Sequence, residues 1–413
     1  MKASKKAFRE PYEAREDTML LIKHMKKYAS DKKDVLEMGT GSGVVAIEAA
    51  KYAKNVLALD INPRAIALAK KNAKGIKNIT IKESDLFSNI DKKSKFDLIL
   101  FNPPYLPYHK DDPDVALDGG KHGYELLGKF LNQINPYLKN EGKILVVFST
   151  FTRPEKVKEF IFKNCFEFKE LDIDHILFED LFLWEIKKSK LLKSLEDKDI
   201  ENIKYFTKGH RGYIYQAKFK KNKIMIKINN PESRATNRIE NEVNFLKRIE
   251  KHNIAPKVLM HVNENKEGEQ LEYFFYKYIK GEFIHYFTED KNTKKKEVIN
   301  VLKQVFEQMF LLDKLGINKE EMHHPVRHVI INKKKIKGKE TINTKLIDFE
   351  RANMTKKPKN VTQFCQFIVS NKFGELLRNK KINVDMDEMI KLAQTYKNNI
   401  NEKNFNNILE LIK

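Results

Sequence analysis

Between residues 34 and 150, short apolar runs alternate with stretches in which apolar residues recur every three or four positions. This pattern predicts strands at DVLEMG, NVLALD, NITIKESDLF, FDLILFNPPY and GKILVVFST. One intervening helix is expected to begin at Asn62, an N-cap residue followed by Pro63. Because the strands are separated by helices, we predict a parallel, doubly wound α/β sheet of the Rossmann type.

The pattern changes twice after residue 150. Two strand-like runs, CFEFKELDIDHILF and LFLWEIKK, predict an antiparallel edge hairpin that closes the sheet near residue 188. The charged stretch 189–200 is expected to be a linker or connecting helix. From residue 201 the apolar residues alternate as in antiparallel strands, and the pattern then becomes helical, with a long helix ending at Gly316. We therefore expect an α/β domain at 1–188 and an α+β domain at 201–413.

Composition and charge narrow the class of protein. The chain has 413 residues, is 41% hydrophobic and carries a net charge of +22. Basic residues number 34 against 28 acidic ones up to residue 190, and 45 against 29 beyond it, so most of the positive charge lies in the second half. This excess indicates either a surface that binds nucleic acid or a Lys-rich surface that is simply solvated. Two cysteines without metal-ligand spacing argue against a disulfide framework or zinc site, and no apolar run reaches the ~18 residues of a membrane helix. A cytoplasmic protein is expected.

The loop after the first predicted strand, EMGTGSG, is rich in glycine. Gly39, Gly41 and Gly43 let the backbone turn tightly and approach a ligand closely. Their G-x-G-x-G spacing differs from the G-x-G-x-x-G of dinucleotide sites, and no Lys-Ser or Lys-Thr pair follows as in a P-loop. A pyrophosphate site is therefore disfavoured.

Acidic residues stand at the ends of three predicted strands. Glu37 opens the glycine loop, Asp60 ends the second strand and Asp85 follows the third. A carboxylate at Asp60 can accept from both hydroxyls of a ribose, and Asp85 can accept from an adenine amino group. Glu37 is suited to a cation. Together the three acids predict a pocket for a nucleoside with a positive group, such as S-adenosylmethionine.

The fourth predicted strand ends in FNPPYLP. Pro103 and Pro104 lack the N–H that a strand requires, so the strand stops and the turn is rigid. The Asn102 side chain and the carbonyl of Pro103 can accept the two hydrogens of a planar –NH2 group, and Tyr105 can stack against it. This arrangement would aim the nitrogen at a methyl donor. The –NH2 group could belong to glutamine or to adenine.

These motifs resemble the HemK/PrmC family of S-adenosylmethionine-dependent protein-glutamine N5-methyltransferases. The resemblance covers about residues 10–188 and rests on YEAREDTMLL, LEMGTGSGVVAI, ALDINPRAI, SDLF, NPPYLP and ALDGGKHGYELL. Bacterial members carry a helical N-terminal domain, and the short start YEAREDT is more similar to the archaeal and eukaryotic branch. The resemblance implies the Gly-Gly-Gln glutamine of a peptide-chain release factor as substrate, and a small zinc-binding activator protein as partner.

The resemblance also implies roles for single residues. Cofactor contacts are expected from Thr18, Glu37, Gly39, Gly41, Gly43, Asp60, Asp85 and Asn102. Substrate contacts are expected from Asn102, Pro103, Pro104 and Tyr105, with Asn102, Pro103 and Tyr105 as the catalytic set. Tyr12 and the 118–124 loop are expected to order the site. The alternative is an adenine-N6 methyltransferase acting on RNA or DNA, which shares N-P-P-Y, but the EDT and DGG segments favour a protein substrate.

The second half resembles atypical kinases of the RIO and Bud type, and more closely a group of archaeal predicted Ser/Thr kinases. The matching residues stand in kinase order: Gly209 and Gly212 in a glycine turn, Lys227 on the next strand, Glu242 in a helix with Glu240 as the neighbouring candidate, and Asp348 in LIDFERA. The resemblance implies a protein-kinase-like fold in which Lys227 binds ATP phosphates and Asp348 binds Mg²⁺.

Three departures from the kinase pattern alter its chemistry. Glu350 replaces the glycine of Asp-Phe-Gly, and alignment of EEMHHPVRHVIIN with the catalytic loop sets His323 at the aspartate and His328 at the asparagine position. A histidine can accept a proton near neutral pH, with Glu320 or Glu321 as alternatives, but Mg²⁺ prefers oxygen ligands. We expect the second domain either to bind ATP and Mg²⁺ or to serve as a basic module that contacts ribosomal RNA or a tRNA-like partner.

Overall fold

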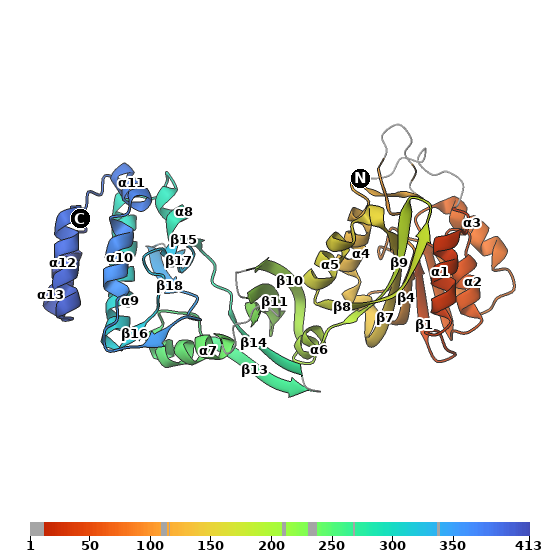
Figure 1. Cartoon of the computed structure of the whole chain (residues 1–413), viewed down its shortest axis with the longest axis horizontal. Helices are drawn as coiled ribbons and strands as arrows, with labels where there is room; N and C mark the ends of the chain where they lie inside the picture. Colours follow the sequence, from red (N-terminus) through yellow and green to blue (C-terminus); the bar gives the residue numbers. More distant parts are fainter. Residues whose placement is uncertain are drawn as a thin grey trace. The chain divides into compact units, whose positions relative to one another are not determined.

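The computed structural model describes residues 12–108, 114, 116–208, 212–229, 238–266, 269–336 and 339–413. The described residues form two compact units, which divide between Ile200 and Glu201 (Figure 1). Each unit has its own sheets and its own buried apolar core.

The first unit is built on a seven-stranded sheet with the order β3-β2-β1-β4-β7-β9-β8. The strands are β1 (Asp34–Met38), β2 (Asn55–Asp60), β3 (Ile79–Glu83), β4 (Phe96–Phe101), β7 (Leu138–Ser149), β8 (Phe166–Ile176) and β9 (Glu179–Lys188). The first five pair in parallel, and β9 and β8 form an antiparallel hairpin at the edge. The predicted doubly wound sheet with its edge hairpin is confirmed.

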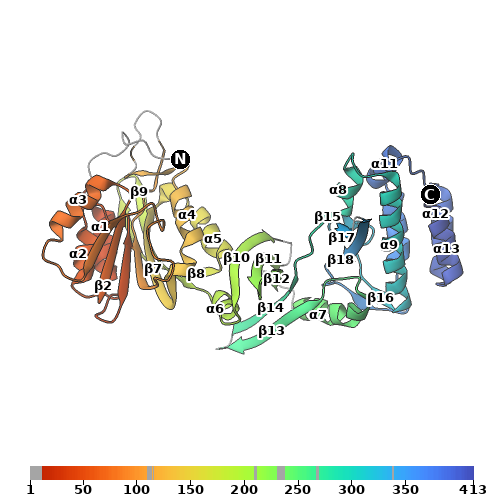
Figure 2. The ribbon, with the colours of Figure 1, turned by 180° about the vertical axis from the view of Figure 1, so that it is seen from behind.

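Helices cover both faces of this sheet, as the ribbon shows from two sides (Figures 1 and 2). On one face lie α1 (Glu16–Met25), α2 (Val44–Ala50) and α3 (Pro63–Asn72). On the other lie α4 (Glu125–Gln133) and α5 (Pro154–Lys163). Because both faces are covered, the central strands β1 and β4 bury almost every side chain, which is why they are continuous apolar runs in the sequence.

Two local features place loops at the carboxyl ends of these strands. Asn62 caps α3 by accepting a hydrogen bond from the N–H of Arg64 at 2.9 Å, with Pro63 in the first turn, as predicted. The strand β4 ends at Phe101, directly before Asn102 and the two prolines, also as predicted. The loops therefore meet at one edge of the sheet, where α/β proteins commonly bind ligands.

Short elements complete the first unit. Outside the main sheet, β5 (Leu106–Pro107) pairs with β6 (Asp118–Gly120). The stretch 189–200 contains α6 (Lys190–Glu196), whose Leu192 and Leu195 are buried. This stretch is an ordered part of the first unit.

The second unit begins with a five-stranded sheet in the order β10-β11-β12-β14-β13. Its strands are β10 (Ile200–Lys208), β11 (Gly212–Phe219), β12 (Asn222–Asn229), β13 (Val258–Lys266) and β14 (Glu269–Lys277). The pairs β11–β12, β12–β14 and β13–β14 are antiparallel, in line with the period-two pattern. The helix α7 (Arg238–Ile249) contacts β12, β13 and β14.

The rest of the second unit is mostly helical. Its helices are α8 (Ile284–Glu289), α9 (Lys295–Lys314), α10 (Asn360–Ile368), α11 (Asn371–Asn379), α12 (Met386–Asn398) and α13 (Glu402–Glu410). Two small sheets join β15 (Glu282–Phe283) to β17 (Val329–Ile336) and β18 (Lys339–Leu346), and β16 (Ile317–Asn318) to β19 (Asn353–Met354). As predicted, α9 ends just before Gly316, whose φ is 67°. None of the described helices combines the length and apolarity needed to cross a membrane.

Candidate functional site

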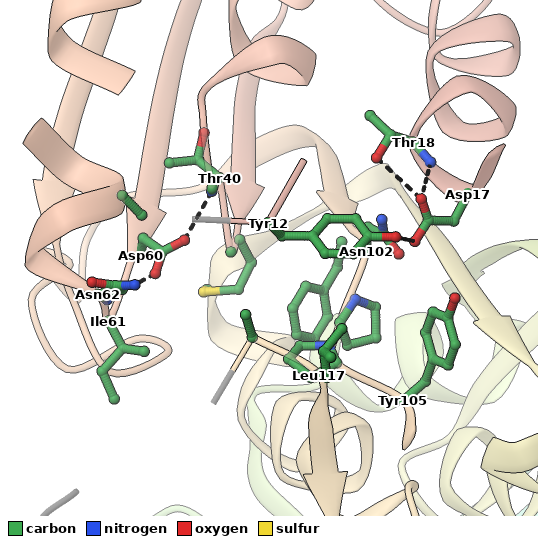
Figure 3. Close-up of a pocket in the computed structure, with 18 of the residues that line it drawn as sticks. Tyr12, Asp17, Thr18, Thr40, Asp60, Ile61, Asn62, Asn102, Tyr105 and Leu117 are labelled. Carbon is green, nitrogen blue, oxygen red and sulfur yellow. Dashed lines mark hydrogen bonds between the residues drawn. The ribbon is translucent and has the colours of Figure 1, made fainter. Parts of the chain in front are cut away.

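A cavity of about 400 Å³ lies in the first unit at the carboxyl ends of the parallel strands (Figure 3). Its wall comes from the loops after β1, β2, β3 and β4, from the start of α1 and from the first residue of β9. The sheet thus brings together residues that are far apart in the sequence. The predicted residues that line the cavity are Thr18, Glu37, Gly39, Gly41, Asp60, Asp85, Asn102, Pro103, Pro104 and Tyr105.

The glycine loop after β1 adopts backbone angles that other residues rarely adopt. Gly39, Gly41 and Gly43 have φ values of 70°, 54° and 85°. Gly39 and Gly41 line the cavity, but Gly43 is absent from the described lining. It precedes α2, and a Cβ there would lie 3.1 Å from the Cβ of Ala69 on α3. Glycine at this position therefore lets α2 pack closely against α3, and the cofactor contact of Gly43 stays a prediction.

Asp60, at the end of β2, is held by backbone donors. Its Oδ2 accepts from the N–H of Gly41 at 2.9 Å and its Oδ1 from the N–H of Asn62 at 2.8 Å (Figure 3). Burial raises the pKa of Asp60, although these hydrogen bonds oppose the shift. Asp85 lines the same cavity from the loop after β3 and is exposed. Two carboxylates therefore line the cavity from neighbouring strands.

Glu37, on β1, is 4% exposed and accepts a hydrogen bond from the hydroxyl of Thr40 at 2.5 Å. Burial raises the pKa of Glu37 to about 8, although the Thr40 hydrogen bond lowers it. The carboxyl group is therefore mostly protonated at neutral pH. A cation in the cavity would favour its ionised form, so Glu37 can couple ligand binding to proton release.

Asn102 follows β4, in the turn that the two prolines make rigid. Its Oδ1 is buried and has no hydrogen-bond partner among the described residues. A buried acceptor left without a partner costs about 1–3 kcal/mol, and a ligand that donates a hydrogen bond removes this cost. The ring of Tyr105 borders the same cavity (Figure 3). The turn thus offers the predicted acceptor and aromatic ring together.

The 118–124 loop supports the turn after β4. It contains β6, which pairs with β5 directly after that turn. A Cβ on Gly119 would lie 2.6 Å from the carbonyl oxygen of Pro104, and one on Gly123 would collide with the carbonyl of Tyr105. Glycine at both positions lets the two backbones approach this closely.

Asp17, in the first turn of α1, is a cavity residue that the sequence did not reveal. It is 3% exposed, and its Oδ1 accepts from the N–H of Thr18 at 2.6 Å and from the Thr18 hydroxyl at 3.2 Å. Its Oδ2 accepts from the hydroxyl of Tyr12 at 3.0 Å (Figure 3). Acids are common in the first turn of any helix, so no local signal marked this one. Asp17 joins Tyr12 and Thr18, which were both predicted to belong to the site.

The cavity is acidic. Its described lining includes one basic residue, Arg15, and the acids Asp17, Glu37, Asp60, Asp85, Asp114, Asp118 and Glu179. The chain as a whole carries a net charge of +22, so the cavity has the opposite sign. Such a lining repels phosphate groups and suits a neutral or cationic ligand.

Comparison with known proteins concerns this first unit. The family model "Methyltransferase small domain" matches residues 14–172. Over 150 residues the chain is 45% identical to a Methanocaldococcus jannaschii protein provisionally named a protein N5-glutamine methyltransferase. The matched region covers 35% of this chain and 74% of that protein.

The chain belongs to the protein N5-glutamine methyltransferase family. Its first unit, the methyltransferase unit, has the class I methyltransferase fold, and the family implies S-adenosylmethionine as methyl donor. The chain is also 34% identical over 148 residues to the release factor glutamine methyltransferase of Clostridium acetobutylicum, covering 32% of this chain and 52% of that enzyme. Among solved structures, one chain of the E. cuniculi Mtq2-Trm112 complex is 26% identical to this chain, with a TM-score of 0.37. The match covers 44% of this chain and all of that chain.

Beyond the methyltransferase unit, the second unit holds a buried cluster of opposite charges. Lys227 Nζ, on β12, lies 2.6 Å from Glu242 Oε2 on α7, 3.1 Å from Asp348 Oδ1 and 3.4 Å from Glu350 Oε2. One oxygen of each acid lies within 4.8 Å of the others, a spacing that can hold a metal ion. Burial alone would lower the pKa of Lys227. The charges of the three acids raise this pKa by more than burial lowers it, so Lys227 stays charged.

Two further side chains complete this charged cluster. Lys319 Nζ donates to the carbonyl oxygen of Asp348 at 2.9 Å and lies 3.3 Å from Nδ1 of His328. Nε2 of His328 is 3.9 Å from Asp348 Oδ2. Burial lowers the pKa of Lys319 to about 8 and that of His328 to about 4. Lys319 was not predicted, because a single lysine in a Lys-rich chain carries no local signal.

The histidines and acids predicted for the catalytic loop separate in the structure. His323 is exposed, and its ring centroid lies 5.0 Å from that of His324. Glu321 accepts a hydrogen bond from Arg351 at 2.5 Å, and its Oε2 lies 3.7 Å from Nε2 of His328. The described contacts therefore join His328 and Glu321, and not His323, to the charged cluster.

The other residues predicted for the second unit also have definite places. Glu240 is exposed on α7 whereas Glu242 is buried, which separates the two candidate partners of the lysine. Gly212 begins β11, and a Cβ there would lie 2.6 Å from the carbonyl oxygen of Ile228. Gly209 lies outside the described residues.

Proposed function

We propose that the methyltransferase unit transfers a methyl group from S-adenosylmethionine to the side-chain amide nitrogen of a glutamine in a peptide-chain release factor. The observation that carries this proposal is Asn102 Oδ1, a buried acceptor of the cavity without a described partner. An amide –NH2 group supplies the donor that this atom lacks. A relative named release factor glutamine methyltransferase supports the choice of substrate.

The described lining fits S-adenosylmethionine. Gly39 and Gly41 allow close approach of the ligand, Asp60 offers a carboxylate to the ribose hydroxyls, and Asp85 offers one to the adenine amino group. Glu37 offers a carboxyl group that a cation would ionise. When bound, the cofactor supplies an electrophilic methyl group on a positively charged sulfur.

The residues of the chain orient the nitrogen that accepts the methyl group. Asn102 Oδ1 and the carbonyl of Pro103 each accept one amide N–H, which fixes the orientation of the nitrogen and raises its electron density, while Tyr105 flanks the planar group. The nitrogen would take the methyl group that S-adenosylmethionine supplies and would then release one proton to water. Since the proton leaves after transfer, no strong base is required, and the acidic lining stabilises the positive charge on the nitrogen.

Adenine in RNA or DNA is the other target that an N-P-P-Y turn could accept. A nucleic acid would bring phosphates to the rim of a cavity whose described lining holds seven acids and one basic residue. Electrostatic repulsion therefore favours a protein segment over a nucleic acid.

Labelled S-adenosylmethionine tests the substrate. The full chain is incubated with a release factor and a small zinc-binding activator protein, and in parallel with total RNA. We expect label on the side-chain nitrogen of one release-factor glutamine, located by mass spectrometry. Label in RNA with none on the release factor would contradict the proposal. Omission of the activator, the partner that the family resemblance implies, should lower the rate.

For the second unit we propose binding of a nucleoside triphosphate with Mg²⁺. This proposal is supported by the 2.6 Å pair of Lys227 and Glu242 beside Asp348, since kinases use such a pair for phosphates and such an aspartate for Mg²⁺. The three oxygens of the cluster add a candidate metal site. Calorimetry with Mg²⁺-ATP tests it, and an absence of heat would leave a basic binding module as the better account.

A further inference from the structure

The turn between β8 and β9 exposes two large apolar side chains. Leu177 is 81% and Phe178 88% exposed, more than any other large apolar residue that the structure describes. Phe178 also has a φ of 76°, a left-handed angle that a bulky residue rarely adopts. The tight turn between β8 and β9 accounts for the left-handed angle. Folding of the unit does not explain why two large apolar side chains are exposed there, and such exposure often marks a contact surface.

The next residue, Glu179, belongs to the cavity. It begins β9 and lines the same cavity as Asn102 and Tyr105. Its Oε2 is buried and has no hydrogen-bond partner among the described residues. Burial raises the pKa of Tyr105, and the charges of Asp17 and Glu179 raise it further, which indicates that Glu179 lies near that ring.

The cavity thus contains two buried acceptors without described partners, Asn102 Oδ1 and Glu179 Oε2. In the proposed reaction the target amide has two N–H groups, and these donate to Asn102 and to the Pro103 carbonyl. Glu179 therefore requires a different donor on the substrate. In a protein segment, the main-chain N–H groups beside the glutamine are the nearest ones available.

We propose that the β8–β9 turn docks the protein that carries the target glutamine. Glu179 accepts a hydrogen bond from a main-chain N–H beside the glutamine, and Leu177 and Phe178 pack against an apolar patch of the same protein. This inference rests on the proposed function. The turn is expected to contact the target protein because it is continuous with the cavity that holds the glutamine. The three residues are consecutive, and Glu179 lines the cavity while Leu177 and Phe178 are open to solvent.

Steady-state kinetics with two substrates tests the docking role. The full chain and its Leu177→Ser/Phe178→Ser variant are assayed with a folded release factor and with a short peptide that spans its glutamine. We expect the variant to raise KM for the release factor about tenfold, because exposed aromatic anchors dominate protein contacts, and to change KM for the peptide less than about twofold. S-adenosylmethionine affinity should be unchanged, which verifies that the unit is folded.

Glu179→Gln tests the second half of the inference, because it keeps the shape of the side chain and removes its charge. It should lower kcat/KM about tenfold for protein and peptide alike, since both present the same main-chain donor. Unchanged kcat/KM for both substrates would remove Glu179 from the substrate contact. Phe206→Ser, at a 57% exposed residue of β10, is the matched control for the double variant and should change nothing.

The outcomes separate this inference from the proposed function. An unchanged KM for the release factor in the double variant overturns the docking role alone, as do equal losses on protein and peptide, which would mean that the turn merely shapes the cavity. A loss that appears only with the activator present assigns the turn to the activator and also overturns it. A wild-type chain that never labels the release factor overturns the proposed function, and the docking role with it.

Discussion

The two units both bury carboxylates around a site, but they differ in whether the key polar group of the site already has a partner. In the methyltransferase unit, Asn102 Oδ1 is a neutral acceptor without a described partner. In the second unit, Lys227 is already paired with Glu242 at 2.6 Å and with Asp348 at 3.1 Å. An unpaired neutral acceptor fits a neutral donor such as an amide, whereas a paired cluster binds a charged ligand by exchange of partners. The unpaired atom, more than the number of acids, therefore indicates the ligand.

The two sites also differ in which residues adopt left-handed backbone angles. The first site places glycines at left-handed angles, where they cost little. The second places Asp348 and Glu321 at φ values of 65° and 58°, and strain of about 1–3 kcal/mol at such a residue is a common mark of a functional site. Both sites are thus built from turns that ordinary residues would avoid.

Removal of the unpaired acceptor should have the largest effect. Asn102→Ala deletes one of the two acceptors of the amide, so we expect kcat to fall about 100- to 1000-fold while S-adenosylmethionine affinity changes less than about twofold. Asp60→Ala should show the reverse pattern, with weaker cofactor binding. Rates come from methyl-transfer assays and affinities from calorimetry.

Asn135→Ala is the matched control for Asn102→Ala. Its Oδ1 is also buried without a described partner, but Asn135 is not among the described lining residues of the cavity. The control should keep its full rate. Equal losses in the two variants would show that the loss comes from a disturbed fold and not from the amide contact.

Disruption of the paired cluster should affect the second unit alone. Lys227→Met is expected to weaken Mg²⁺-ATP binding about 10- to 100-fold, because a charged hydrogen-bond donor to phosphate is lost, and to leave methyl transfer unchanged. It should also destabilise the second unit by about 3–5 kcal/mol in denaturant unfolding, because Glu242 stays buried without its partner. Lys218→Met, at an exposed position of β11, should do neither. Unchanged ATP binding in Lys227→Met would remove the kinase-like assignment.

A smaller effect is expected from the support of the N-P-P-Y turn. Gly119→Ala would place a Cβ 2.6 Å from the carbonyl oxygen of Pro104 and displace the turn that carries Asn102. Misplacement by a few tenths of an ångström should lower kcat about tenfold with little change in cofactor binding. Gly374→Ala, in α11 of the second unit, serves as control, because a Cβ there makes only ordinary contacts of 3.4 Å or more. A normal kcat in Gly119→Ala would show that the loop does not position the turn.

The smallest expected effect concerns pH. Since burial raises the pKa of Glu37 to about 8, the free protein holds this carboxyl protonated at neutral pH, and a cationic ligand binds with loss of that proton. Affinity for S-adenosylmethionine should therefore rise with pH, about fivefold between pH 7 and pH 8, and calorimetry in buffers of different ionisation heat should detect proton release. Glu37→Gln, which cannot ionise, should give a flat profile. A wild-type profile that is equally flat would remove Glu37 from the cofactor contact.

Particular residues show why some parts of the site were predictable and others were not. The glycine loop, Asp60, Asn102 and the prolines are marked by spacing and by their place after apolar runs, and the structure places them around one cavity. Asp17, Glu179 and Lys319 occupy ordinary contexts, a helix start, a hairpin turn and a Lys-rich stretch. They matter because of what surrounds them, which no short window of sequence contains.

The sequence by itself determined the parallel sheet, its edge hairpin and the loops at its carboxyl end. Apolar periodicity and turn residues act locally, so they can be recognised along the chain. The tertiary structure alone decided which acceptors remain unpaired, that the cavity is acidic in a basic chain, and that Glu242 rather than Glu240 meets Lys227. Burial and pairing depend on distances between residues far apart in the chain, and those distances exist only once the chain has folded.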